Sequence, residues 1–419
     1  MTRTERQQEA VKHWIAAKGK GSIEAATGFG KTNMGLMSIR ALLKKYPHFR
    51  VLVVVPTTTL KNQWQEKIDT EGFSFNVEIQ VINTVIKHEW FCDFLVIDEV
   101  HRVNSDDFSK IFSCVKYKLI LGLTATFERL DGKHIIMQRY CPIVDNISFL
   151  ECLANGWVSD YKEYVVLINV DNIEEYKKLN KEWTEHFEFF QFDFNLAMSM
   201  VKPGIGWKNK LAYRDELYKG DDDKKKKEIL GAINYHSVRF MQTMQLRKSF
   251  INNHPKKIEI AKKIIEARSD KKIITFSNNV NMAESIGIGD VYTGRISKKR
   301  SATMIKEFNA AKTGVLNTCA KANEGLDIRG LSVAIILGTD SSETKARQRR
   351  GRTVRKEGDK IAEVFYLVIK DTTEEKWVKN NHKTDSNYIT IDENGLEQVL
   401  RGETPDLYRP KLGQIMFRF

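Results

Sequence analysis

One segment of the sequence has the residue types needed to hold a phosphate. The octapeptide AATGFGKT (25–32) comes shortly after Ile23 and opens the amphipathic stretch 31–46. A glycine-rich turn at a helix start points backbone N–H groups at a phosphate, while Lys31 can reach the β- and γ-phosphates and the Thr32 hydroxyl can ligate Mg²⁺. Gly28 and Gly30 suit such a turn, whereas the full pattern has glycine in place of Ala25. An ordinary glycine-containing turn is the alternative interpretation.

Two neighbouring acids follow the apolar run 94–97. Asp98 and Glu99 would lie at the carboxyl end of a buried strand, which is where α/β folds bind their ligands. Asp98 can then hold Mg²⁺, and Glu99 can accept the proton of an attacking water, as hydrolysis of a phosphoanhydride requires. A polar loop start, in which the acids only cap a helix, is the alternative.

A third feature lies far along the chain, in the basic segment QRRGRTVR. If this segment is helical, Arg352 and Arg355 are one turn apart and share a face, so both could reach a γ-phosphate whose charge spreads in the transition state. A solvated basic helix face is the more common outcome for such a cluster. A nucleotide held between two modules would explain all three features together.

Short apolar runs and amphipathic stretches alternate along the chain and must position these groups. The apolar runs are typical of buried parallel strands and cover residues 51–55, 94–97, 119–123, 273–276, 315–318, 334–337 and 364–369. Residues 31–46 and 258–267 have helical spacing. This alternation is typical of βαβ units, so we predict an α/β fold with two doubly wound parallel-sheet domains.

The strands fall into two clusters, separated by a stretch with helical spacing. Within it, residues 225–253 would form a helix roughly 40 Å long at about 1.5 Å per residue. A cluster of phenylalanines between residues 187 and 194 is more typical of a helical core than of a base-stacking surface. We expect a first domain over 1–150, a mainly helical insertion or linker over 151–255, a second domain over 256–385 and a tail over 386–419.

The composition describes a folded, basic protein. At roughly 150 residues per domain, 419 residues allow two to three domains, and 42% hydrophobic residues argue against extended disorder. The 67 Lys and Arg exceed the 54 Asp and Glu by 13, a balance that favours polyanionic partners without identifying one. Five scattered cysteines without a CxxC pair indicate a reducing compartment and argue against a zinc site. The aliphatic runs are too short to cross a membrane, so we expect a cytoplasmic protein with no membrane partner.

The order of these segments resembles the motifs of superfamily 2 DExH helicases and translocases, whose two RecA-like domains enclose ATP. The matching segments are AATGFGKT (motif I), VVVPTTTLKNQW (Ia), DEVH (II), LTAT (III), IITFS (IV), TCAKANEGLDI (V) and QRRGRTVR (VI). Within the superfamily, DEVH together with TATFERLDG and YTGRISKKR is most similar to the group of the xeroderma pigmentosum B helicase and the phage branch-migration helicase UvsW.

The resemblance assigns roles to further residues. Gln7 would read adenine, although Thr4 stands where the family's R-x-x-Q pattern has arginine. Asp327 would contact the ribose or the two arginines of the second module. The residues that would link hydrolysis to domain closure are His101, Thr124, Thr126 and Gln348, and those that would touch the tracked strand are Thr58 and Thr318.

The resemblance also implies an activity. The protein would be a nucleic-acid-stimulated ATPase that uses ATP and Mg²⁺ to move on single-stranded, forked or branched DNA, and that unwinds or branch-migrates forks, junctions or displacement loops. Its setting would be a bacterial or phage-infected cell and its process recombination, repair or replication. Three alternatives stay open: a duplex DNA translocase that does not separate strands, an RNA helicase, and a nucleic-acid-binding scaffold that does not hydrolyse ATP.

Overall fold

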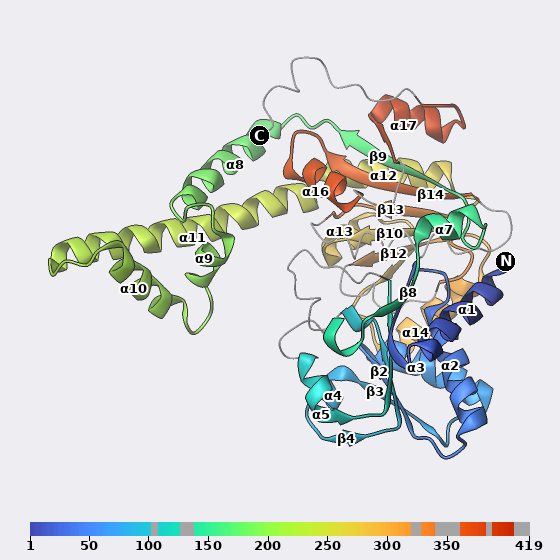
Figure 1. The fold of residues 1–419 in the computed structure, drawn as a ribbon. Coiled ribbons are helices and arrows are strands. Elements are labelled where there is room, and N and C mark those ends of the chain that lie inside the picture. Colours follow the sequence, from blue (N-terminus) through green and yellow to red (C-terminus); the bar gives the residue numbers. More distant parts are fainter. Residues whose placement is uncertain (102–107, 126–137, 320–327, 340–360, 383–387, 406–419) are drawn as a thin grey trace.

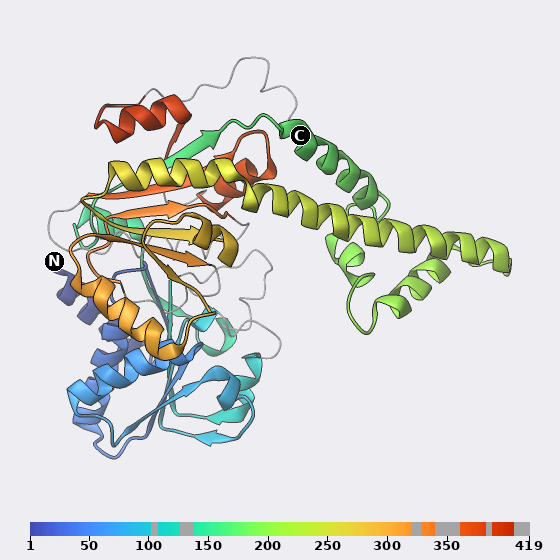
Figure 2. The ribbon, with the colours of Figure 1, turned by 180° about the vertical axis from the view of Figure 1, so that it is seen from behind.

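The computed structural model describes residues 1–101, 108–125, 138–319, 328–339, 361–382 and 388–405. Two parallel sheets, each flanked by helices, are stacked one above the other, and a helical arm projects from the side of the second (Figure 1). The view from behind shows the same arm extending well beyond both sheets (Figure 2). Within the described ranges, a search for helices with the length and hydropathy of a membrane span finds none.

The first sheet has six strands in the order β3-β2-β5-β7-β1-β8, and all its pairings are parallel. Its strands are β1 (Lys20–Ala25), β2 (Val51–Val55), β3 (Val77–Val81), β5 (Phe94–Asp98), β7 (Leu119–Thr124) and β8 (Ile143–Ile147). The three predicted strands of this domain are confirmed, with β5 and β7 one residue longer than expected. Because β7 lies between β1 and β5, the carboxyl ends of these three strands are neighbours.

Helices cover both faces of the first sheet. They are α1 (Arg3–Ala16), α2 (Lys31–Lys45), α3 (Thr58–Glu71), α4 (Ile82–Val85), α5 (Ile111–Cys114) and α7 (Phe149–Ala154), with a 3-10 turn η2 (Phe108–Lys110). Two short strands, β4 (Trp90–Phe91) and β6 (Val115–Lys116), pair with each other away from the main sheet. Trp14 and Trp64 are the two largest fully buried side chains among the described residues and belong to the same core cluster.

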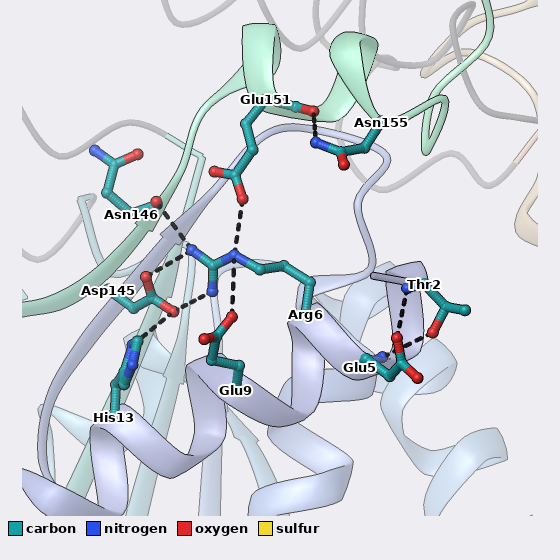
Figure 3. A network of polar contacts seen from close by, with 9 residues as sticks. All are labelled: Thr2, Glu5, Arg6, Glu9, His13, Asp145, Asn146, Glu151 and Asn155. Carbon is teal, nitrogen blue, oxygen red and sulfur yellow. Dashed lines mark hydrogen bonds and ion pairs between the residues drawn. The ribbon is translucent and has the colours of Figure 1, made fainter.

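A polar network fixes helix α1 against the edge of the first sheet (Figure 3). The Arg6 guanidinium donates to both Asp145 oxygens at 2.6 and 2.8 Å and to Glu151 Oε1 at 2.8 Å, and His13 and Glu9 lie beside it. Burial raises the pKa of the Asp145 carboxyl, but the hydrogen bonds and the charge of Arg6, together with His13, outweigh this effect, so that pKa stays below its usual value. The network holds the start of α1 in one position relative to β8.

The second sheet has seven parallel strands in the order β11-β12-β10-β13-β14-β9-β15. They are β9 (Tyr161–Ile168), β10 (Lys272–Ser277), β11 (Asp290–Tyr292), β12 (Gly314–Cys319), β13 (Val333–Ile336), β14 (Ala362–Ile369) and β15 (Ile389–Ile391). β9 pairs with β14 along its whole length, and β15 pairs with the other edge of β9. The domain bounds expected from the sequence assign residues 161–168 to the helical segment and residues 389–391 to the tail, and the structure corrects both assignments. Both are strands of the second sheet, so the second domain begins before the arm.

The central strands β10, β13 and β14 are buried on both faces, which is why their sequences contain continuous apolar runs. The helices of this domain are α12 (Pro255–Ala267), α13 (Val280–Ser285), α14 (Lys298–Ala310), α16 (Thr373–Asn381) and α17 (Glu393–Leu400). The predicted helix over 258–267 is confirmed and begins three residues earlier, at Pro255, because His254 caps it from outside.

The arm is an insertion between β9 and α12. It consists of α8 (Ile173–Glu188), α9 (Phe194–Ser199), α10 (Gly206–Leu217) and α11 (Asp223–Asn253). The single long helix expected over 225–253 is confirmed as α11, whose 31 residues give a rod about 46 Å long at about 1.5 Å per residue. The expected phenylalanine core is confirmed at Phe190, which is buried with Phe240, whereas Phe192 is exposed.

Candidate active site

The glycine loop, residues 26–30, joins β1 to α2. Gly28 and Gly30 have φ of 90° and 102°, values that favour glycine. A Cβ on Gly30 would lie 2.6 Å from Gln7 Nε2, so a side chain is excluded there for steric reasons as well. Gly30 is the N-cap of α2 and has no side chain that could accept hydrogen bonds from the first N–H groups of the helix. These N–H groups are therefore available to bind an anion.

Asp98 ends β5 and is almost fully buried. Its Oδ2 accepts a hydrogen bond from Trp64 Nε1 at 2.9 Å, and its Oδ1 accepts one from Glu99 N at 2.9 Å. Burial, and then the charge of Glu99, raise the pKa of Asp98 to about 6, while Trp64 and the charge of Lys31 act in the opposite direction. Two adjacent carboxyl groups in this setting repel each other and would be stabilised by a cation.

Glu99 has a strained backbone. Its φ is 51°, in the left-handed region that residues other than glycine seldom adopt, at a cost on the order of 1–3 kcal/mol. In this conformation Glu99 Oε1 lies 3.9 Å from Lys31 Nζ, and Oε2 lies 3.3 Å from His101 Nδ1. The same His101 nitrogen is 3.0 Å from Thr124 Oγ1, at the end of β7. The carboxyl ends of β1, β5 and β7 therefore bring these four side chains into one cluster.

Helix α1 contacts the glycine loop through two side chains. Gln7 Nε2 donates to the Phe29 carbonyl at 2.7 Å, and Arg3 Nε donates to the same carbonyl at 2.9 Å. The other Arg3 contact is from Nη2 to the Gly28 carbonyl. Sequence reasoning missed Arg3, because it compared the arginine of the family pattern with Thr4. The spacing of four residues between Arg3 and Gln7 was the available signal, since it places both on one helix face.

The structure brings most of the predicted first-domain residues together. Those at the carboxyl edge of the first sheet or on the adjoining loop and helix are Gln7, Gly28, Gly30, Lys31, Thr32, Asp98, Glu99, His101 and Thr124. The predicted residues Thr126, Asp327, Gln348, Arg352 and Arg355 lie outside the described residues.

The two predicted strand contacts differ in accessibility. Thr58 is exposed at the first position of the 14-residue helix α3, where Thr57 is the N-cap. Thr318 is fully buried in β12, and its hydroxyl donates to the Thr275 carbonyl at 2.7 Å. In this structure the Thr318 side chain therefore cannot reach a nucleic acid, contrary to the expectation for it.

The residues present fit a nucleotide that carries its own Mg²⁺. The Thr32 hydroxyl and the Asp98 carboxylate are hard oxygen ligands, and Mg²⁺ in such sites takes one or two protein ligands together with phosphate oxygens. Among the described residues, no group of three or more His, Cys, Asp or Glu is placed to bind a metal by itself. Lys31 and the N–H groups of the glycine loop are the positively charged and dipolar groups that the phosphates of such a nucleotide would need.

Comparison with known families agrees with this geometry. Residues 1–90 and 74–129 match the family described as type III restriction enzyme, res subunit, and residues 256–357 match the helicase conserved C-terminal domain. The first match covers the glycine loop and the acidic pair. The second begins within α12 and covers strands β10 to β13 of the second domain.

Individual relatives share both domains. The DNA 3'-5' translocase XPB2 of Sulfurisphaera tokodaii is 28% identical over 390 residues, which are 88% of this chain and 82% of the relative. Putative helicase 22 of a Sulfolobus islandicus filamentous virus is 23% identical over 90% of this chain and 67% of its own. The structure of Dbp5 from S. cerevisiae, bound to RNA and ADP BeF3, has a TM-score of 0.60 at 12% identity over 94% of this chain and 91% of its own, which shows the same fold. The chain belongs to the superfamily 2 helicases and is an ATPase built from two RecA-like domains.

Proposed function

We propose that this protein is an ATP-driven motor that moves along DNA and separates or remodels branched strands. The observation that carries the proposal is the convergence of Lys31, Asp98 and Glu99 at one edge of the first sheet. The named activity of the XPB2 relative supports DNA as the track and 3'-5' as the direction. Branch migration in recombination or repair, in a bacterial or phage-infected cell, is the finer part of the proposal. The five unpaired thiols suit a reducing compartment.

Each residue of the cluster has a distinct part in hydrolysis. Bound ATP with Mg²⁺ supplies the phosphoanhydride and its electrophilic phosphorus. Lys31 would neutralise phosphate charge, Asp98 and Thr32 would hold the metal, and Glu99 would orient a water and take its proton. His101 contacts both Glu99 and Thr124, so it connects the proton acceptor to the strand that leads into motif III.

The second domain would complete the site. We assign Arg352 and Arg355 to the γ-phosphate, Asp327 to the ribose or to these arginines, and Gln348 to coupling, all by the motifs in which they occur. Loss of the γ-phosphate would remove the attraction between the domains and let them part. Alternate gripping of one strand by the two domains would then move the protein along it.

Grip on the track would be independent of sequence. Thr58, exposed at the start of α3, offers a hydroxyl and helix-terminal N–H groups to a backbone phosphate. Because the phosphate group is the same at every nucleotide, a protein that holds the strand through such contacts can move along it without reading the bases.

The first experiment tests the catalytic assignment. Lys31→Ala and Glu99→Gln should each abolish ATP turnover stimulated by DNA, while DNA binding in a filter or anisotropy assay stays close to that of the unchanged protein. Lys44→Ala, an exposed lysine in the last turn of the same helix α2, is the control and should keep full turnover. Undiminished turnover in either active-site variant would refute the assignment.

A second experiment tests the track. ATP turnover measured with single-stranded DNA, duplex DNA and RNA of equal length decides between a DNA and an RNA motor. Two assays then distinguish unwinding from translocation on duplex DNA. One measures the release of strands from forks, four-way junctions and displacement loops, and the other measures the release of a triplex strand from duplex DNA. Stimulation by RNA alone, or triplex displacement without fork unwinding, would replace the proposal by one of the alternatives.

A further inference from the structure

The turn at residues 200–208 joins α9 to α10 and includes the first three residues of α10, and it carries the exposed Trp207 between two exposed lysines in the sequence. We propose that this turn is a second DNA contact, in which Trp207 stacks on an unpaired base at a branch point and Lys202 and Lys208 bind the adjoining phosphates. The inference rests on the proposed function and adds the place at which branched DNA meets the arm.

The turn is a fixed structure. Gly206 N donates to the Lys202 carbonyl at 2.8 Å and closes the turn, and Asn209 Nδ2 donates to the last carbonyl of α9 at 2.8 Å. A Cβ on Gly206 would lie 2.6 Å from the Met200 carbonyl oxygen, so the backbone packs closely here. Such a turn presents its side chains in a set direction, which lowers the entropy lost on binding.

Two apolar side chains of this turn stay in water although a core lies directly beneath. Trp207 is 58% exposed and Ile205 is 42% exposed. The buried residues of the arm core are Phe190, Ala197, Met200, Tyr213, Ile233 and Phe240. A large aromatic ring held outward by a rigid turn gains free energy when a flat partner covers it.

The charge around the turn selects a polyanion as that partner. Residues 200–214 contain four basic residues and no acidic ones. Lys210 donates to Asn234 at 2.8 Å and Arg214 pairs with Asp215, whereas Lys202 and Lys208, which precede and follow Trp207 in the sequence, are exposed.

An aromatic ring between lysines is the combination that binds an unpaired nucleotide, because the base stacks while its phosphates are neutralised. A membrane contact would need a longer apolar face than the two exposed apolar residues supply.

The arm is joined to the second domain at several points, so the turn moves with that domain. At the root of the arm, Asn278 Nδ2 donates to Asn252 Oδ1 at 2.7 Å, and the Tyr176 hydroxyl accepts from Thr373 N at 3.0 Å. The turn lies on the side of α11 that faces the first domain (Figures 1 and 2). Rotation of the second domain during ATP turnover would therefore displace the turn relative to a strand held by the first domain.

The test compares three variants on two DNA substrates. Trp207→Ala should weaken binding to a forked duplex with single-stranded arms by roughly five- to 150-fold, the range for loss of one stacked base. Trp207→Phe keeps a stacking ring and should restore most of the affinity and of the strand displacement. Phe75→Ala removes a fully exposed aromatic ring from the first domain and should leave fork binding unchanged. Turnover on short single-stranded DNA should be the same in all variants.

Two outcomes would overturn the inference. One is unchanged fork binding and displacement in Trp207→Ala. The other is an equal loss of turnover on single-stranded DNA, which would mean that the substitution disturbs the arm rather than a branch contact. Failure of the proposed function itself is distinguishable, since the unchanged protein would then show no DNA-stimulated turnover at all.

Discussion

The fully buried ion pair between Lys257 and Glu374 links α12, the helix that follows the arm, to the carboxyl ends of two central strands of the second sheet, and it can be tested by substitution. Lys257 Nζ lies 2.6 Å from Glu374 Oε1, and both side chains are completely shielded from water. The same ammonium donates to the Leu337 carbonyl at 2.9 Å, and Glu374 Oε2 accepts from Ile369 N at 3.1 Å. The pair thus connects α12, α16 and the ends of β13 and β14.

The magnitude follows from this burial. Lys257→Met leaves the carboxylate buried with backbone donors only, and breaking a buried pair in this way costs about 3–5 kcal/mol. Adding Glu374→Gln removes the charge but keeps an acceptor for Ile369 N, so the double variant should recover most of that loss. Lys263→Met, which disrupts only a surface pair with Glu259 on the same helix, should cost about 1 kcal/mol or less.

The pH dependence provides a second signature. Burial raises the pKa of Glu374, and the charge of Lys257 opposes this shift. Without Lys257 the folded protein binds a proton at Glu374 more readily than the unfolded chain does. The stability of Lys257→Met should therefore rise as the pH falls towards the ordinary range of a carboxyl group.

The assay is hydrogen exchange at the amides of α12 and α16, because a two-domain chain need not unfold in a single step. Protection measured at two pH values gives the local free energy of opening for each variant. The reasoning is refuted if the double variant is as unstable as Lys257→Met, or if the loss in Lys257→Met does not shrink at lower pH.

Two further predictions concern the site and the arm. Trp64→Phe removes the N–H that binds Asp98, a bond to a charged group worth about 1.5–3 kcal/mol, so turnover at limiting Mg²⁺ should fall at least about ten-fold. The control is Trp14→Phe, which loses an equally buried hydrogen bond to the Ile120 carbonyl of β7 and should lower only the melting temperature. An unchanged Mg²⁺ requirement in Trp64→Phe would count against the role of Trp64 in positioning Asp98. In the arm, burial lowers the pKa of His186 and of His236, whose Nδ1 atoms lie 3.1 Å apart. The unfolded arm therefore binds protons more readily, and protection of α8 amides should decrease as the pH falls below about 6.5, a trend that His236→Gln should reduce. The same slope in that variant would contradict the explanation.

Much of the fold was predictable because parallel strands buried on both faces have sequences that are apolar at nearly every position. The run Val51–Val55 is apolar at every position, and the structure has it as a strand with the same bounds. Strand β9 was missed because Tyr161–Ile168 begins with polar residues and is followed by a helical segment. Its place beside Ala362–Ile369 depends on pairing with residues far along the chain, which no local pattern encodes.

The candidate site was predictable where its chemistry is local. Lys31 follows its glycines directly, and Asp98 ends an apolar run, so residue type and spacing were enough. The bond from Trp64 to Asp98 was not predictable, because it depends on how α3 packs against β5. The left-handed backbone conformation of Glu99 was not predictable from the sequence either, because contacts in the folded protein impose it.

The position of β9 has a consequence for how this protein is made. Tyr161 pairs with Ala362, so β9 leaves the ribosome about 200 residues before its first partner, and β15 follows later still. At about 5–20 residues per second, the N–H and C=O groups on both edges of β9 would remain unpaired by their native partners for on the order of 10–40 s. An unpaired strand of this kind is an aggregation hazard. Production at lower temperature, or with chaperones that shield nascent strands, should therefore raise the yield of native protein, and chains that stop short of residue 362 should accumulate in inclusion bodies.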